Sequence, residues 1–216
     1  MIDLHTHSIF SDGELIPAEL IRRAVAMGYK AIAITDHIDQ SNMDLIIPRI
    51  AGAVEALRSF VPIKVIVGAE ITHVPPALIP DMVKEARRLG ARLVVVHGET
   101  IVEPVAEGTN RAAIEAGADI LAHPGLITHD DLMFAREKGI TLEITARKGH
   151  SLSNGHVAAS ATALGILLTV NSDAHCPSDL ISREFAEKVL LSAGIDAGNL
   201  RKVFLNAEAL LERALR

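Results

Sequence analysis

Two pairs of residues in this sequence are spaced to bind a metal ion. His5 and His7 are two positions apart, as are Asp173 and His175. In an extended segment, side chains at positions i and i+2 point the same way, so each pair offers two ligands on one side of the chain. Imidazole and carboxylate groups together suit Zn, Mn or Fe. The two pairs therefore predict a metal site.

Four single residues extend this set of candidate ligands. They are His37, Glu70, His97 and His123. The eight ligands exceed what one ion can use, and a carboxylate such as Glu70 can bridge two ions. Without metal, so many titratable groups in one place would repel one another and be costly to desolvate, whereas bound cations reverse that balance. We therefore expect two or three divalent ions.

The elements that must position these ligands follow an alternating pattern. Seven short apolar runs alternate with segments of helical apolar spacing that often end at a glycine, such as Gly28 or Gly139. Such alternation predicts a parallel sheet covered by helices. The sequence contains neither a GxGxxG nor a Walker pattern, which favours a closed barrel over an open, doubly wound sheet. The predicted strands cover residues 2–4, 30–35, 64–68, 92–96, 119–122, 141–144 and 166–170.

The candidate ligands nearly all lie just past the C-terminal end of a predicted strand. In an α/β barrel these ends converge on one rim, so residues far apart in the sequence gather there. His97 follows the fourth predicted strand and His123 the fifth. Glu143 differs because it lies within the sixth strand. The pattern predicts one site at the rim of a single domain that spans residues 1–216.

A short basic segment after the sixth strand lies on the same predicted rim. It contains Arg147, Lys148 and His150. One interpretation is a solvated loop. The other, which we favour, is a clamp for a substrate phosphate, because arginine supplies a bidentate fork and lysine a point charge. These three residues are therefore candidate substrate-binding residues.

Several other polar residues have simpler interpretations. His73, His129 and His156 fit solvated or helix-capping positions, and Cys176 fits a small packed residue better than a nucleophile. Asp12, in a Ser-Asp-Gly segment, fits two roles equally well. It is either a turn residue that bonds its own backbone or a metal ligand.

The composition restricts the environment and the partners. Hydrophobic residues make up 49% of the chain, but no apolar run approaches the roughly 18 residues that span a bilayer, so we expect no membrane contact. The single cysteine cannot form an internal disulfide, and the N-terminus shows no export signal, which together predict a cytoplasmic location. The net charge of -6 and the 3% of aromatic residues argue against a long nucleic acid as the main partner. If the basic segment after the sixth strand binds phosphate, we therefore expect a small phosphorylated substrate.

These motifs, in this order, resemble the PHP (polymerase and histidinol phosphatase) family. The resemblance covers the chain from residue 5 to residue 175. It implies a distorted (β/α)7 TIM-like barrel with parallel strands and a di- or trinuclear site that uses Zn, Mn or Fe. The matching segments are His5-Thr-His7-Ser, Ser11-Asp12-Gly13, Thr35-Asp36-His37, Gly68-Ala-Glu70, His97, Ala122-His123-Pro124 and Asn171-Ser-Asp173-Ala-His175.

The resemblance also implies how the ligands are divided among the ions. Some relatives carry histidine where this chain has Asp12. The ligand set of the third ion, to which Asp12 would belong, therefore differs from the set in those relatives. By this similarity the first ion uses His5, His7, Glu70 and Asp173, the second uses Glu70, His97 and His123, and the third uses Asp12, His37 and His175.

The expected function is hydrolysis of phosphate monoesters of a histidinol-phosphate or nucleotide type by a metal-activated water. Asp173 or His175 would relay a proton to the leaving group. The first alternative is a phosphodiesterase or 3′ exonuclease acting on short oligonucleotides, because the same centre would cleave diesters. Amidohydrolase-type C–N cleavage is disfavoured because no lysine fits at a strand end. A non-catalytic binding subunit would be expected to lose ligands that this chain keeps.

Overall fold

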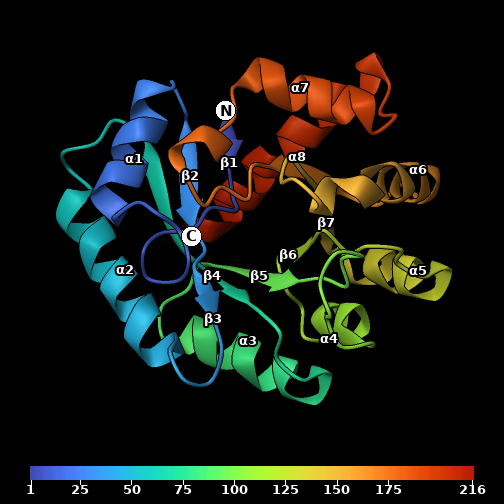
Figure 1. Ribbon diagram of the computed structural model, residues 1–216, viewed down its shortest axis with the longest axis horizontal. Coiled ribbons are helices and arrows are strands. Elements are labelled where there is room, and N and C mark those ends of the chain that lie inside the picture. The colour runs from blue at the N-terminus through green and yellow to red at the C-terminus, as the bar shows by residue number, and fades with distance from the viewer.

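The computed structural model describes residues 1–216 and shows a parallel sheet that curls into a nearly closed barrel with helices around it (Figure 1). The strand order is β1-β2-β4-β5-β6-β7-β8, and the short β3 pairs with β4. The predicted seven-stranded barrel is confirmed. Only β3 was missed, because two residues are too few to show a periodic pattern. The strands are β1 (Ile2–Asp3), β2 (Ala31–Ile34), β3 (His37–Ile38), β4 (Lys64–Ile71), β5 (Leu93–His97), β6 (Ile120–Ala122), β7 (Thr141–Thr145) and β8 (Leu168–Asn171).

Hydrogen bonds between the segments that follow β1 and β8 bring the first and last strands together. The backbone N–H of Asp173 donates to the carbonyl of His5 over 3.0 Å, and the N–H of His7 donates to the carbonyl of Ala174 over 2.9 Å. Thr6 and Ala174 form a parallel bridge at the same place. The barrel therefore closes through the two segments that carry the paired candidate ligands.

The helices cover the outside of the barrel and begin and end at residues whose chemistry explains their position. Pro17 occupies the first turn of α1, and the Thr128 side chain caps α5 by accepting from the N–H of Asp131. Gly139 ends α5 with a φ of 68°, which glycine adopts without strain. The helices are α1 (Pro17–Ala26), α2 (Met43–Leu57), α3 (Ile79–Arg88), α4 (Thr109–Glu115), α5 (His129–Lys138), α6 (Asn154–Leu164), α7 (Arg183–Ser192) and α8 (Leu200–Ala214).

Two apolar clusters lie on the two faces of the sheet. The larger one, of 50 buried residues, packs the strands against the surrounding helices. The smaller one, of 12 residues, fills the barrel interior and includes three residues of α8, which packs against β1 and β8. No helix combines the length and the apolar character that a bilayer span requires.

The inner face of β7 and β8 is polar along its length, whereas the inner residues of the other strands are apolar except at the rim. Leu142, Ile144, Leu168 and Val170 point outward into the larger cluster. Because side chains alternate along a strand, the residues between them point inward. These inner residues are Thr141, Glu143, Thr145, Thr169 and Asn171, and all are buried. A buried polar strip therefore lies inside the barrel beneath the rim.

Candidate metal centre

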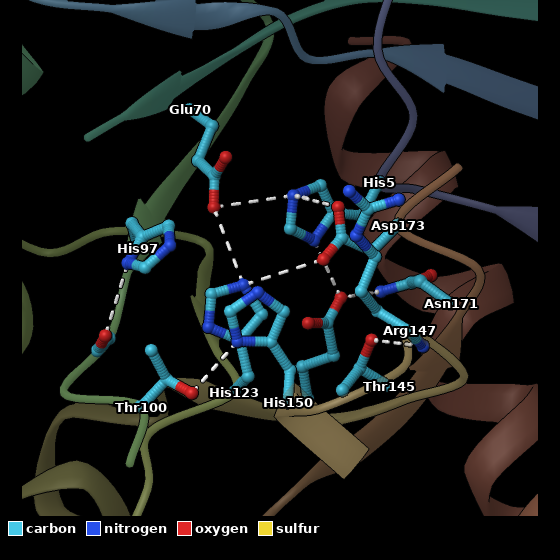
Figure 2. A network of polar contacts seen from close by, with 12 residues as sticks. His5, Glu70, His97, Thr100, His123, Thr145, Arg147, His150, Asn171 and Asp173 are labelled. Atoms are coloured by element: carbon cyan, nitrogen blue, oxygen red, sulfur yellow. Dashed lines mark hydrogen bonds and ion pairs between the residues drawn. The ribbon is translucent and has the colours of Figure 1, made fainter. Parts of the chain in front are cut away.

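The predicted ligands gather at the C-terminal ends of the strands, as the barrel geometry requires (Figure 2). Two of them lie slightly earlier than expected. Glu70 is inside β4, which continues to Ile71, and His97 is the last residue of β5. His37 belongs to β3, whose register with β4 sets it beside Glu70. From the sequence, Glu70, His97 and His37 were all expected just beyond the end of a strand.

A polar pocket of about 240 Å³ opens at this rim, and no hydrophobic residue lines it. The pocket includes Arg147 and His150 of the predicted substrate-binding segment, but Lys148 is exposed and does not line it. His73, which we interpreted as a solvated residue, lines the pocket although its side chain is 43% exposed. The lining residues are Asp12, His37, Thr72, His73, His97, Glu103, His123, Arg147, His150, Asp173 and His175.

The residues expected to hold the first ion form a fully buried group. His5 Nε2 lies 3.3 Å from Glu70 Oε1, and His7 Nε2 lies 3.2 Å from Asp173 Oδ1. Burial alone would raise the pKa of Glu70, but the nearby rings of His5 and His37 lower it well below its ordinary value. The pKa of Asp173 is also held well below its ordinary value, since His5 and His7 outweigh the effect of burial. Both carboxylates are therefore charged.

The hydrogen bonds of His5 show which ring nitrogen is free to bind a cation. Nδ1 lies 2.9 Å from Glu143 Oε1, and an ionised carboxylate only accepts, so Nδ1 donates. In the neutral ring Nε2 then carries a lone pair, and it faces the oxygens of Glu70 and Asp173 at 3.3 and 3.7 Å. His5 Nε2 and Glu70 Oε1 have no hydrogen-bond partner. A positive charge satisfies these atoms, either as a proton on Nε2, since Glu143, Glu70 and Asp173 raise the pKa of His5 despite its burial, or as a cation bound between the groups.

His7 supports a metal ion as that charge. Burial lowers the pKa of His7 to about 3, so its ring is neutral. Neither ring nitrogen has a hydrogen-bond partner, although both are buried. Buried polar atoms nearly always find partners, and a neutral imidazole beside charged carboxylates is the usual form of a metal ligand. These donors therefore fit divalent cations.

The residues expected to hold the third ion are also close together. His175 Nδ1 donates to the carbonyl of Asp173 over 2.9 Å, which turns Nε2 toward Asp12 Oδ1 at 3.2 Å. His37 Nε2 lies 3.4 Å from the same oxygen. Burial would raise the pKa of Asp12, but His175 and His37 lower it. Of the two roles open to Asp12, its position beside these rings favours the ligand.

The residues expected to hold the second ion have a further imidazole beside them. His123 Nε2 lies 3.8 Å from Glu70 Oε1, and the ring nitrogens of His97, His123 and His150 lie within 4.8 Å of one another. The His150 ring stacks on that of His123 with centroids 4.2 Å apart. Burial and the charge of His97 lower the pKa of His123 well below its ordinary value. The structure therefore places His150 beside two predicted ligands.

Arg147 has a partner of its own at the pocket wall. Its Nη1 donates to Asp179 Oδ2 over 3.1 Å, and the same carboxylate oxygen accepts from the N–H groups of His175 and Cys176. The guanidinium is thus held in place beside His175. A planar, fixed guanidinium is suited to binding a phosphate group.

Three side chains that support or line the candidate site were not assigned a role from the sequence. Asp36 accepts from the Ser8 N–H and from the hydroxyls of Ser8 and Ser11, so it supports the loop that carries the first ligands. Glu143 was noticed, but its bond to His5 was not. Glu103 meets the pocket histidines from a loop without any motif. Asp36 had a usable signal, its position beside His37, whereas Glu103 had none.

Backbone strain is concentrated at the same pocket. The non-glycine residues with positive φ are His73, His123 and Asp173, at 52°, 27° and 53°. All three line the pocket. Such conformations cost energy and persist where the surrounding structure imposes them, which is common at functional sites.

Comparison with known proteins identifies the family. Residues 3–137, more than half of the chain, match the PHP domain. The chain belongs to the PHP domain family. The resemblance inferred from the motifs is confirmed, and with it the α/β barrel whose rim carries a His, Asp and Glu cluster consistent with a metal site. An uncharacterized protein of Methanocaldococcus jannaschii is 50% identical over 214 residues, which covers 98% of each chain.

Two solved structures share the fold of this PHP protein. A chain of archaeal ribonuclease P with mature tRNA has a TM-score of 0.74 at 17% identity, covering 98% of this chain and 90% of that one. Histidinol phosphate phosphatase from Lactococcus lactis, in complex with Zn, L-histidinol and phosphate, has a TM-score of 0.58 at 18% identity, covering 90% and 94%. At these identities the similarity concerns the fold alone.

Proposed function

We propose that this protein is a metal-dependent phosphoesterase that hydrolyses small phosphate monoesters. The observation that carries the proposal is the set of buried imidazole nitrogens that converge with carboxylates beside a pocket with no hydrophobic lining. We propose two or three ions of Zn, Mn or Fe, held by the nine predicted ligands. These ligands are His5, His7, Asp12, His37, Glu70, His97, His123, Asp173 and His175.

Each side chain has a role in the proposed reaction. Divalent ions, when bound, supply a water-derived nucleophile at neutral pH and neutralise charge on the phosphate. Arg147 binds a non-bridging phosphate oxygen from the pocket wall. Where the third ion is not bound, a protonated Nε2 of His175 would give its proton to the leaving oxygen, and Asp173 orients the ring through its carbonyl, which accepts from Nδ1.

The size of the pocket favours monoesters. A cavity of about 240 Å³ accommodates a phosphate group and a small alcohol or part of a nucleotide, whereas ligand sites commonly span roughly 300–1,000 Å³. The net charge of -6 also opposes binding of a long phosphate backbone. The Lactococcus lactis phosphatase, which binds Zn and phosphate, shares the barrel and supports this substrate class. A histidinol-phosphate or nucleotide type of monoester is therefore our first candidate.

The substitution Asp173→Asn tests the proposal because it keeps the shape of a ligand but removes its charge. The variant should lose one or more metal equivalents by elemental analysis and should release phosphate from a monoester panel at a rate reduced by roughly 100-fold or more. Asp130→Asn, at an exposed position on α5, is the matched control. Wild-type turnover by Asp173→Asn would refute the proposed centre, and turnover of diesters or short oligonucleotides alone would favour the nuclease.

The similarity to a ribonuclease P chain supports a second candidate, a binding subunit of an RNA-containing complex. The chain keeps its ligand set and has no strongly basic composition, so we rank this candidate second. A labelled structured RNA would distinguish the two. Tight binding at moderate salt by metal-free protein that hydrolyses no ester would favour the binding subunit.

A further inference from the structure

Glu103 is the one carboxylate at the pocket mouth that no predicted ligand set includes. It lies near the tip of the loop between β5 and α4, and three imidazoles meet its two oxygens. Oε2 lies 3.1 Å from His73 Nε2 and 3.2 Å from His97 Nε2, and Oε1 lies 3.4 Å from His150 Nε2. Glu103 thus links a predicted ligand, His97, to two residues outside the predicted set.

The hydrogen bonds of His97 determine what faces Glu103. His97 Nδ1 donates to the carbonyl of Gly98 over 3.1 Å, so in the neutral ring Nε2 carries a lone pair. That lone pair faces a carboxylate oxygen of Glu103 at 3.2 Å. A cation between these two acceptors satisfies both.

His150 is oriented toward the same place. Its Nδ1 is bonded to Thr100 Oγ1 over 2.8 Å, which fixes the ring and leaves Nε2 facing Glu103 Oε1. A ligating histidine usually has its other nitrogen held by such an outer partner. The ring nitrogens of His97, His123 and His150 already lie within 4.8 Å of one another.

Among these four side chains, Glu103 alone is open to solvent. Its side chain is 37% exposed, whereas those of His97, His123 and His150 are buried. The base of its loop is fixed, because Glu99 accepts from the N–H groups of Gly108 and Asn110. The tip at Ile101 and Val102 is exposed. Glu103 is therefore the member of this group that solvent and a substrate can reach.

We propose that Glu103 and His150 are ligands of the ion bound by His97 and His123, and that Glu103 holds the coordination position that a substrate phosphate takes. This inference rests on the proposed metal centre. Together with Glu70, these side chains would supply three imidazoles and two carboxylates to one ion, which would leave no open position for a substrate. A phosphate oxygen is also an anionic oxygen donor, so it would take the place of Glu103 on the bound ion. His73 holds the carboxylate from the solvent side.

Zinc titration of the variants Glu103→Gln and His150→Gln tests the ligand assignment. With a chromogenic chelator as competitor, each variant should bind one zinc equivalent roughly tenfold more weakly and the others as in the wild type. The double variant Glu103→Gln/His150→Gln should still bind the other zinc equivalents as the wild type does, because both residues are expected to hold the same ion. Glu107→Gln in the same loop and His129→Gln on α5 are matched controls at exposed positions. A Glu103→Gln titration identical to the wild type would show an imidazolium–carboxylate pair instead and would overturn the assignment.

Calorimetry with inorganic phosphate on the zinc-loaded proteins tests the displacement. Glu103→Gln should bind phosphate several-fold more tightly than the wild type, because a neutral amide is a weaker competitor for the ion. Equal or weaker binding would refute the displacement. If the wild-type protein binds zinc but hydrolyses no ester, the proposed function is refuted. The zinc titration would still show whether Glu103 and His150 are ligands. Wild-type protein without zinc would refute both.

Discussion

Glu143 orients His5 from inside the barrel, and this bond illustrates how single residues prepare the metal centre. One oxygen of Glu143 accepts from His5 Nδ1 and from Asn171 Nδ2. Asn171 in turn accepts from the N–H of Leu4 through Oδ1, over 2.9 Å. The chain of bonds connects β1, β7 and β8 at the point where the barrel closes. The orientation of a ligand and the pairing of the strands thus depend on the same buried amide.

At this scale we predict that Glu143→Gln weakens metal binding without unfolding the protein. The amide keeps the shape of the side chain but accepts more weakly from His5, so the ring becomes a poorer ligand. Loss of such an outer partner typically costs about 10- to 100-fold in metal affinity. Competition with a chromogenic chelator measures the effect, and Glu137→Gln at an exposed position of α5 is the control. Unchanged zinc affinity would show that His5 needs no such partner.

At the scale of elements, the loops after β5 and β6 are pressed together beneath the pocket. A Cβ on Gly125 would lie 1.8 Å from the carbonyl oxygen of Glu99, and one on Gly98 would lie 2.4 Å from that of Ala122. Gly125 also has a φ of 62°. Because His123 lies two residues before Gly125, this contact helps to determine where its ring points.

We therefore predict that Gly125→Ala destabilises the protein more than Gly117→Ala does. Gly117 has a similar φ of 69°, but nothing lies within 4 Å of its added Cβ. Both substitutions incur about 1 kcal/mol of left-handed strain, and only Gly125→Ala adds a clash with backbone. Urea denaturation should show a lower midpoint for Gly125→Ala, together with reduced metal content. Equal midpoints would mean that the two loops separate at little cost.

At the scale of the whole molecule, the barrel closes through the segments that carry His5, His7, Asp173 and His175. Metal bound there joins the first strand to the last. A cation that binds only the folded state also stabilises that state by mass action. Removal of metal should therefore affect the entire fold and not the rim alone.

We predict that a chelator lowers the Tm by about 5–10 °C. Loss of one ion present at 100 times its Kd costs about 2.7 kcal/mol, and 1 kcal/mol corresponds to about 2–4 °C for a chain of this size. Differential scanning calorimetry with and without chelator measures the shift. Asp173→Asn should show a smaller shift, since part of its metal is already lost. An identical Tm in both conditions would mean that metal does not stabilise this barrel.

The sequence alone determined the barrel and most of the candidate centre. Strands of four or five apolar residues, helices ended by glycine, and the i, i+2 pairs are local patterns, and local patterns are visible without coordinates. Since parallel strands end on one rim, the ligands that follow them had to meet there. His5, His7, His123, Asp173 and His175 were located in this way.

Only the tertiary structure decided which ring nitrogens face which carboxylates. Glu103 comes from a loop with no periodic pattern, and its approach to His97 and His150 depends on how that loop folds back over the rim. Likewise, the exposure of Lys148 and the place of His73 at the pocket mouth follow from loop conformation. Backbone direction at a strand end is set by repeating hydrogen bonds, whereas a loop side chain is placed by contacts between residues distant in sequence, which no local pattern records.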